Sequence, residues 1–304
     1  MGRPMATSQD FVNWVCGPEL NPAYLKYVLM LEQESVRRFA HGTTHQTMYY
    51  PEAKALHALL PDRPTQDAVA DVLGELDGKI AANEGVQKLI GQLCATLLHR
   101  KAAERPMTTL TALGAVCDGA IRPDDNGTLR YLDISMVGVG SFAFPEERPW
   151  PGAPGRARRA LRAGDTVWST VRPNRRSHAL ILDDCELVGS TGLAVLRPHA
   201  NRVASLFEAS RTGAFSRYLE SVAEGSAYPA VRVSLFAHAP VPDLTEAEWN
   251  EFEVLAMPLR GRAHAAEVEN RALTMVRDEL LPLLMSGKLR VRDLPDALTE
   301  DLPR

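Results

Sequence analysis

A seven-residue repeat of mainly apolar side chains in residues 64–104 is the strongest constraint on the fold. One register holds Val69, Leu76, Asn83, Ile90 and Leu97, and the neighbouring stripe holds Leu73, Ile80, Val86 and Leu93. This spacing predicts a single amphipathic helix of roughly 40 residues and on the order of 60 Å, with Thr65 as its N-cap. A helix of that length needs a partner to cover its apolar stripe.

A partner with the same spacing occurs later in the chain, at residues 244–284. Its register holds Phe252, Leu259, Ala266, Leu273 and Leu280. Thr245 is its predicted N-cap, and Pro258 predicts a kink in its first third. The sequence therefore predicts two long helices that pair within one chain.

The two long helices end two copies of a longer unit, offset by about 180 to 187 residues. Each copy opens with an amphipathic helix pattern that follows an Asn, at Asn21 and Asn201. A Gly with a Ser or Thr, a Tyr-Pro pair and a proline-rich end then lead into the long helix. The second copy alone is preceded by strand-like runs, in residues 107–200, with Pro and Gly turns between them.

Composition narrows the class of protein. The chain has 304 residues, 45% of them hydrophobic and 24% charged, which is typical of a globular chain. It shows neither a signal-peptide core nor an apolar run long enough for a membrane span, so we expect a cytoplasmic protein with no membrane contact. Its four widely spaced cysteines indicate neither a disulfide framework nor a zinc site, and we expect no metal and no cofactor.

Charge is unevenly distributed along the chain. The net charge is -4, yet residues 122–232 contain fifteen arginines, no lysine and twelve carboxylates. Eight of these arginines lie between Arg148 and Arg176, in segments rich in Pro and Gly. A solvated surface is one explanation, but loops on a rigid scaffold are also where binding residues concentrate.

The order of these parts resembles the specificity subunit of type I restriction-modification systems. The matching stretches are "GDTVWSTVRPNRRSHALI", "GSTGLAVLRP", "RYLESVAEGSAYPAVR", "LPDRPTQDAVADVLGELDGKIAANE" and "LLPLLMSGKLRVRD". The resemblance implies an α+β fold in which a small mixed α/β target recognition domain accompanies two long antiparallel coiled-coil helices. The implied divisions are 1–62 for the end of a first, truncated recognition domain, 63–106 and 243–290 for the helices, 107–242 for a complete recognition domain, and 291–304 for a tail.

The resemblance also implies a function. The chain would recognise a sequence in double-stranded DNA and direct methyltransferase (modification) and restriction subunits to it, with no catalysis of its own. The alternative is a half-subunit that acts as a scaffold or regulator, pairing with a second specificity chain or competing for modification subunits without binding DNA specifically.

Two segments hold the candidate DNA-binding residues, which are Arg172, Asn174, Arg175, Arg176, Ser226 and Tyr228. An arginine can grip a phosphate or the edge of guanine, and an asparagine can read adenine. We assign Arg172 to positioning or to an internal ion pair, for example with Asp165, and Arg175 and Arg176 to DNA. Tyr228 could stack on a base, or it could pack in the core against Pro229.

Other motifs point weakly to other chemistry. "NPAY" at residues 21–24 resembles the N-P-P-[YFW] signature of amino-methyltransferases but lacks its second proline and a preceding glycine-rich strand. His41, His45 and His57 have no carboxylate at ligand spacing, so we interpret them as a chance cluster.

The paired helices lead to one further expectation. Asn83 falls in the apolar register of the first helix, and Asn270 lies beside that of the second. We predict that antiparallel pairing buries at least one of them between the helices, where a polar side chain fixes register at some cost in stability.

Overall fold

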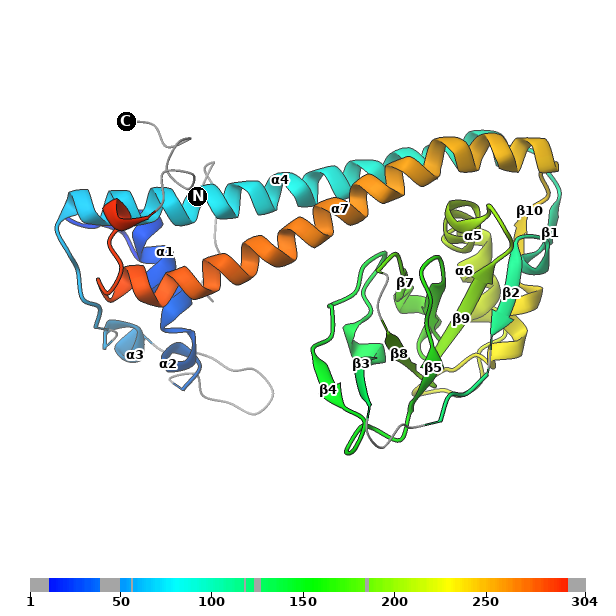
Figure 1. Ribbon diagram of the computed structural model, residues 1–304, viewed down its shortest axis with the longest axis horizontal. Helices are drawn as coiled ribbons and strands as arrows, with labels where there is room; N and C mark the ends of the chain where they lie inside the picture. The colour runs from blue at the N-terminus through cyan, green and yellow to red at the C-terminus, as the bar shows by residue number, and fades with distance from the viewer. Residues whose placement is uncertain are drawn as a thin grey trace. The chain divides into compact units, whose positions relative to one another are not determined.

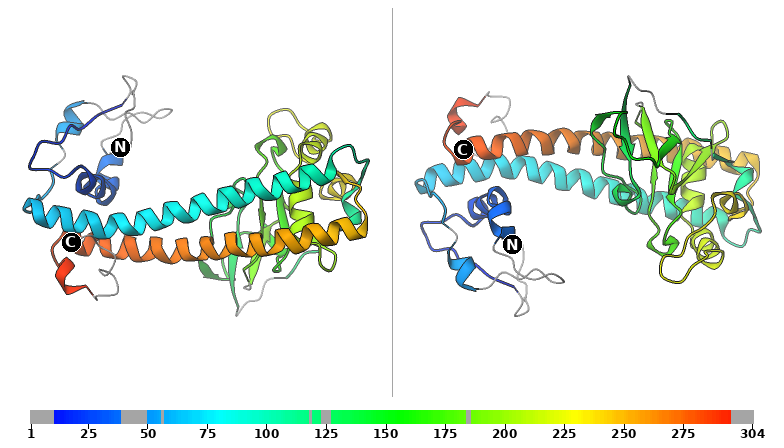
Figure 2. Two further views of the ribbon diagram at one scale, coloured as in Figure 1. Left: turned by 90° about the horizontal axis from the view of Figure 1, so that it is seen from above. Right: turned by 90° about the horizontal axis from the view of Figure 1, so that it is seen from below.

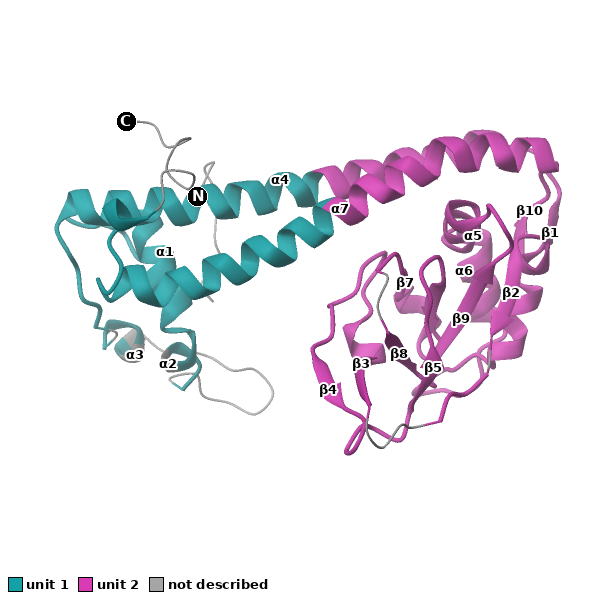
Figure 3. Cartoon of the chain, in the orientation of Figure 1, with its two compact units in different colours: residues 1–85, 266–304 teal, residues 86–265 magenta. Residues whose placement is uncertain are grey.

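The computed structural model describes residues 11–38, 50–55, 57–117, 119–122, 127–183 and 186–294. The chain forms two compact units (Figure 3). Unit 1 comprises residues 1–85 and 266–304, and unit 2 comprises residues 86–265. Each unit contains part of both long helices, α4 (Arg63–Ala102) and α7 (Glu246–Met285).

Unit 1 is helical in the part that the structure describes. Its elements besides α4 and α7 are α1 (Pro22–Leu31), α2 (Gln33–Arg38), α3 (Tyr50–Lys54) and the 3₁₀ turn η5 (Val291–Asp293). Its core joins α1, the start of α4 and the end of α7 through Tyr24, Tyr27, Val28, Val69, Ala70, Val72, Leu73, Leu281, Leu284 and Leu294. The Asp77 carboxylate ties the three helices together, because it accepts hydrogen bonds from Lys26, from the Tyr27 hydroxyl at 2.8 Å and from Arg277 at 2.9 Å.

Helices α4 and α7 lie side by side and antiparallel within each unit (Figure 2). In unit 1, Asn83 is only 2% exposed and donates hydrogen bonds to Asn270 Oδ1 at 2.9 Å and to Glu269 Oε2 at 2.7 Å. Asn270 in turn donates to the Ile80 carbonyl at 3.2 Å. The predicted burial of an asparagine between the helices is therefore confirmed.

Two details of the predicted first helix are wrong. Leu93 is exposed, and Cys94 takes the buried position, because the seven-residue spacing from Leu73 and Ile80 leads to residue 94. The N-cap is not Thr65: the helix begins at Arg63, and the Asp62 carboxylate accepts a hydrogen bond from the Thr65 backbone N–H at 3.2 Å. For α7 the predicted cap is correct, since the Glu248 N–H donates to the Thr245 hydroxyl at 3.3 Å and the Thr245 N–H donates to the Glu248 carboxylate at 2.9 Å, which is a capping box.

Unit 2 contains two four-stranded sheets and a short two-stranded pair (Figure 1). The first sheet has the order β2 (Gly114–Cys117), β9 (Leu193–Pro198), β6 (Thr166–Ser169), β7 (His178–Leu180), and all its pairs are antiparallel. The second has the order β4 (Glu147–Pro149), β3 (Thr128–Leu132), β8 (Leu187–Ser190), β5 (Ala157–Ala160), in which only β3 and β8 pair in parallel. Strands β1 (Met107–Thr109) and β10 (Pro240–Pro242) pair next to the ends of the long helices.

The two short helices of unit 2, α5 (Val203–Ser210) and α6 (Gly213–Ser221), pack on the first sheet. The unit also contains the 3₁₀ turns η1 (Leu110–Ala112), η2 (Ile134–Met136), η3 (Pro173–Arg175) and η4 (Val233–His238). One large core joins β9, α5 and α6 with Ile90, Cys94 and Leu98 of α4 and Trp249, Phe252 and Ala256 of α7. Smaller cores fill the sheets around Val167 and around Leu129.

The described elements repeat, but each copy opens with two short helices where the sequence predicted one. Two short helices separated by a break, one further short helical turn and a 40-residue helix occur in the order α1, α2, α3, α4 and again as α5, α6, η4, α7. A second expectation differs: Asn201 does not cap α5, since it adopts a left-handed backbone with φ +59° and the N-cap position falls to Arg202.

The chain is thus an α+β protein with two long helices paired antiparallel, as the sequence predicts. Among the described residues, no helix combines the length and the apolarity that a bilayer span requires.

Candidate nucleic-acid interface

The arginine-rich segment that the sequence singled out forms the connection between β6 and β7. Its centre is the 3₁₀ turn η3, and the residues on either side of this turn, Arg172 and Arg176, have left-handed backbones with φ +52° and +54°. Such values are unfavourable for a residue with a side chain, so the surrounding structure has to hold the turn. The turn packs against α6.

The second predicted segment lies directly beside this connection. The Arg172 N–H donates to the Pro229 carbonyl at 2.7 Å, and the Val231 N–H donates to the Thr170 carbonyl at 2.8 Å. The second segment itself is a loop closed by paired hydrogen bonds between Glu224 and Ala230, with Gly225 at φ +98°. Residues 170–177 and 224–232 therefore form one continuous surface, which we call the two-loop surface.

Arg172 and Tyr228 link the two loops through their side chains. The guanidinium carbon of Arg172 lies 4.3 Å from the centre of the Tyr228 ring, which is a cation–π contact. Tyr228 is 69% exposed, so core packing against Pro229 is the wrong interpretation. The ion pair of Arg172 with Asp165 is also wrong, because Asp165 is buried and binds Arg197 at 2.7 Å.

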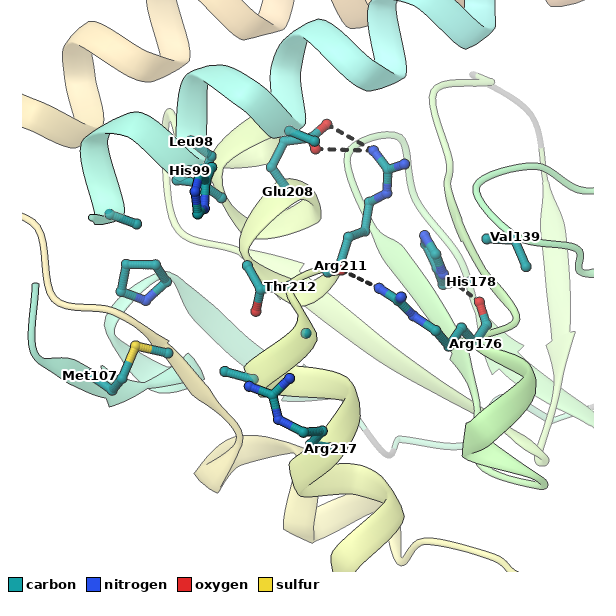
Figure 4. A pocket seen from close by; sticks show the side chains of 15 residues that line it. Leu98, His99, Met107, Val139, Arg176, His178, Glu208, Arg211, Thr212 and Arg217 are labelled. Atoms are coloured by element: carbon teal, nitrogen blue, oxygen red, sulfur yellow. Dashed lines mark hydrogen bonds and ion pairs between the residues drawn. The ribbon is translucent and has the colours of Figure 1, made fainter. Parts of the chain in front are cut away.

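The remaining predicted residues divide between the outside and the inside of the molecule. Asn174, Arg175 and Ser226 are exposed on the two-loop surface. Arg176 is half-buried, and its guanidinium donates to the backbone carbonyl of Arg211 at the break between α5 and α6 (Figure 4). The structure thus brings together Arg172, Asn174, Arg175, Ser226 and Tyr228, whereas Arg176 turns toward the interior.

A group of buried charged side chains packs against the break between α5 and α6. The Glu208 carboxylate, 1% exposed, accepts from Arg211 at 3.0 Å and forms a second ion pair with Arg260 of α7. Burial lowers the pKa of Arg211, although Glu208 opposes this shift. The guanidinium groups of Arg211 and Arg260 also face the Phe207 ring at 5.0 and 4.8 Å.

His178 at the start of β7 is a residue that sequence reasoning missed. It is 1% exposed, its ring stacks on Trp168 at 4.7 Å, and its Nδ1 lies 2.6 Å from the Arg176 carbonyl. Burial lowers the pKa of His178 to about 3, so the ring is neutral at neutral pH. A neutral ring then donates from Nδ1 to Arg176 and fixes the end of the turn. Only the position of His178, next to the arginines, could have signalled this role.

The rival motifs have structural explanations or lie outside the described residues. Asn21 of "NPAY" caps α1, since its side chain accepts from the Ala23 and Tyr24 N–H groups at 2.7 and 3.3 Å. Its amide also donates to Asp67 of α4. His41 and His45 are outside the residues that the structure describes.

Comparison with known proteins identifies solved structures with a similar fold. No protein-family profile and no curated protein sequence matches the chain. A type I restriction-modification system S subunit from M. genitalium shares its fold with a TM-score of 0.52 at 18% identity, covering 88% of this chain and 73% of that one. The likeness agrees with the α+β architecture of two long helices expected from the sequence.

Two further solved structures are similar over shorter spans. The HsdS subunit from Thermoanaerobacter tengcongensis is 25% identical over 59% of this chain and 47% of its own length, with a TM-score of 0.43. A structure of the type I R-M system, determined for complex assembly and conformational transition, is 27% identical over 66% of this chain and 50% of its own, with a TM-score of 0.43. The chain thus spans about half the length of these two proteins.

Proposed function

We propose that the protein is a DNA sequence-recognition subunit of a type I restriction-modification complex. The observation that carries this proposal is the two-loop surface: two segments almost fifty residues apart, each identified in the sequence as a candidate for DNA binding, form one exposed surface. The fold shared with an S subunit supports the same function. Methylation and cleavage would belong to separate subunits, and the complex would act in the cytoplasm, where the DNA lies.

The exposed side chains of this surface suit a duplex. Arg175 can bind a phosphate or the O6 and N7 atoms of guanine, and Asn174 beside it can pair with the N6 and N7 atoms of adenine. Tyr228 presents a ring face that the Arg172 guanidinium already orients. We assign Arg176 to holding the turn, because its guanidinium is engaged with Arg211 inside the molecule.

The paired helices offer a surface for the modification subunits. Apolar side chains point outward on both helices, among them Leu89 and Leu93 on α4 and Val254, Leu255 and Met275 on α7. Leu89 and Leu93 are four residues apart and therefore share one face of α4, and apolar residues that are exposed together can mark an interface. We therefore place the docking of modification subunits on the outer faces of α4 and α7.

Methylation by the chain assembled with its modification subunit tests the proposal. Asn174→Ala, Arg175→Ala and Tyr228→Ala are compared with wild type over a library of randomised duplex targets at two salt concentrations. A lost base contact should cost about 1 to 3 kcal/mol on the preferred sequence only, and it should relax the preference at one position. A lost phosphate contact should weaken all sequences alike and reduce the salt slope by about one unit.

Arg105→Ala serves as the control, because Arg105 pairs with Glu248 next to the helix ends and lies outside the two-loop surface. It should leave the preferred sequence unchanged. If all three loop variants methylate the same sequences at the wild-type rate, the two-loop surface does not read DNA. Assembly with modification subunits without any duplex binding would instead favour the scaffold or regulator.

A further inference from the structure

A cavity of about 550 Å³ lies in unit 2, next to Arg176 at the end of the β6–β7 connection. It lies between the C-terminal turns of α4, the first turn of α6 and the end of the β6–β7 connection (Figure 4). Leu98, Met107, Val139 and Pro242 are among its apolar lining. Its volume falls within the range of cavities that hold small organic molecules, roughly 300 to 1,000 Å³.

The polar lining of this cavity is mainly cationic. Arg176, Arg211 and Arg217 contribute three guanidinium groups. Glu208 is the only carboxylate among the residues that line the cavity, and it already binds Arg211 and Arg260. The cavity therefore retains an excess of positive charge next to an apolar wall.

The first turn of α6 adds to this preference for an anion. Gly213 and Ala214, the first two residues of this nine-residue helix, line the cavity. The Thr212 hydroxyl caps the N–H of Phe215 at 3.3 Å, whereas helix geometry gives the preceding N–H groups no partner within the helix. Such N–H groups and the helix dipole favour negative charge.

Two side chains that line the cavity each have a polar atom without a hydrogen-bond partner. His178, 1% exposed, has no hydrogen-bond partner at Nε2, and Arg176 has none at Nε. Since His178 Nδ1 carries the proton that reaches the Arg176 carbonyl, Nε2 is an acceptor. Buried polar groups nearly always find partners in native proteins, so a small shift of either side chain toward the cavity would give it a partner on a bound molecule.

We propose that this cavity binds a small organic anion whose apolar body carries a hydrogen-bond donor, such as an N–H, for His178 Nε2. Its carboxylate, sulfonate or phosphate would lie at the start of α6 between the guanidinium groups of Arg176 and Arg217. Its aromatic or aliphatic part would cover Leu98, Met107 and Val139. Because Arg176 ends the turn that carries Asn174 and Arg175, the bound anion would also hold that turn in place.

Binding of two fluorescent probes to the full chain tests the proposal. The anion is 8-anilinonaphthalene-1-sulfonate, and its neutral counterpart is N-phenyl-1-naphthylamine, which lacks the sulfonate. We expect Arg217→Gln to raise the Kd of the sulfonate probe about tenfold, because it removes one charge-assisted contact, and to leave the neutral probe unchanged. Ala95→Trp fills the apolar side, so it should abolish this binding of both probes.

Arg262→Gln is the matched control, because it removes the same charge from an exposed position on α7 outside the cavity. It should bind both probes as the wild type does. Circular dichroism at the assay temperature verifies that each variant is folded. The proposal is overturned if Arg217→Gln binds the sulfonate probe as tightly as wild type, or if Ala95→Trp keeps that binding. Displacement of the probe by short duplex DNA would also overturn it, because the cationic wall would then belong to the DNA interface.

Discussion

Helices α1 and α5 begin the two copies of the repeated unit, yet they are held in different ways. The Asn21 side chain caps α1 locally, and only Tyr24, Tyr27 and Val28 of that helix are buried. Helix α5 has no side-chain cap from its own N-cap residue, and seven of its eight residues are buried. Its first N–H groups are capped from α7, because Glu253 accepts from Ala204 at 2.9 Å and from Ser205 at 2.8 Å.

The strands of unit 2 explain this difference. Helix α5 packs on β9 and β10 on one side and on the long helices on the other, so little of it remains exposed to water. A buried helix end cannot use water to satisfy its N–H groups, and a distant carboxylate replaces the local cap. In unit 1, where the described residues form no strand, a partly exposed α1 keeps the local asparagine.

The largest predicted effect separates these two caps. Glu253→Ala leaves two buried N–H groups and the Ser205 hydroxyl without their acceptor, so we expect a loss of about 3 kcal/mol in the free energy of unfolding of unit 2. Asn21→Ala removes a half-buried cap and should cost about 1 kcal/mol in unit 1. Hydrogen exchange of the α5 and α1 amides measures the two effects separately.

Equal protection of α5 in wild type and Glu253→Ala would show that the carboxylate does not hold the helix end. Glu251→Ala is a suitable control, since Glu251 is two residues away but faces Lys101 at the surface. Exposed ion pairs contribute little to stability, so this variant should stay within about 1 kcal/mol of wild type.

The second prediction uses pH to distinguish the units. His178 has a folded pKa of about 3, below its ordinary value of 6.5, so the unfolded chain binds a proton between these values and the folded chain does not. The stability of unit 2 should therefore decrease as the pH falls from 6.5 toward 3. Between pH 7 and pH 5, one such histidine should lower the free energy of unfolding by about 2 kcal/mol.

His178→Phe should remove most of this pH dependence, whatever it does to stability at pH 7. Denaturant unfolding followed by tryptophan fluorescence at pH 7 and pH 5 gives the comparison, because three of the four tryptophans, Trp150, Trp168 and Trp249, belong to unit 2. In contrast, Asp77 of unit 1 has a lowered pKa through its bonds to Lys26, Arg277 and Tyr27, although burial opposes this effect. Its contribution is lost only below about pH 4. If the stability of His178→Phe depends on pH as strongly as that of the wild type, His178 is not the source of the pH dependence.

The smallest predicted effect concerns the long helices in unit 1. Replacing Asn83 and Asn270 together by leucine removes a buried amide pair without leaving one amide unpaired, so it should stabilise the paired helices by roughly 1 kcal/mol. Asn83→Leu alone should gain less, because the Asn270 side chain loses a partner. Thermal melting of the single and double variants tests this order. A lower melting temperature in the double variant would mean that the amides stabilise the pair.

The sequence determined the elements whose signals are periodic and local. The seven-residue spacing predicted both long helices, and the Thr245-x-x-Glu248 pattern forms the cap of α7. The same spacing placed Asn83 between the helices, since position in a heptad fixes which face a residue occupies. The strand-like runs expected within residues 107–200 include strands β6 and β9.

Tertiary structure decided how the loop residues are used. The sequence identified residues 170–177 and 224–232 separately, but contacts such as the hydrogen bond from Arg172 to Pro229 made them one surface. It could not show that Arg176 turns inward while Arg175 stays exposed, because the left-handed backbone at Arg176 is imposed by contacts with α6 and His178. Nor could it show that Glu253 caps a helix about fifty residues earlier. These contacts depend on burial and on residues distant in the chain, which no local pattern records.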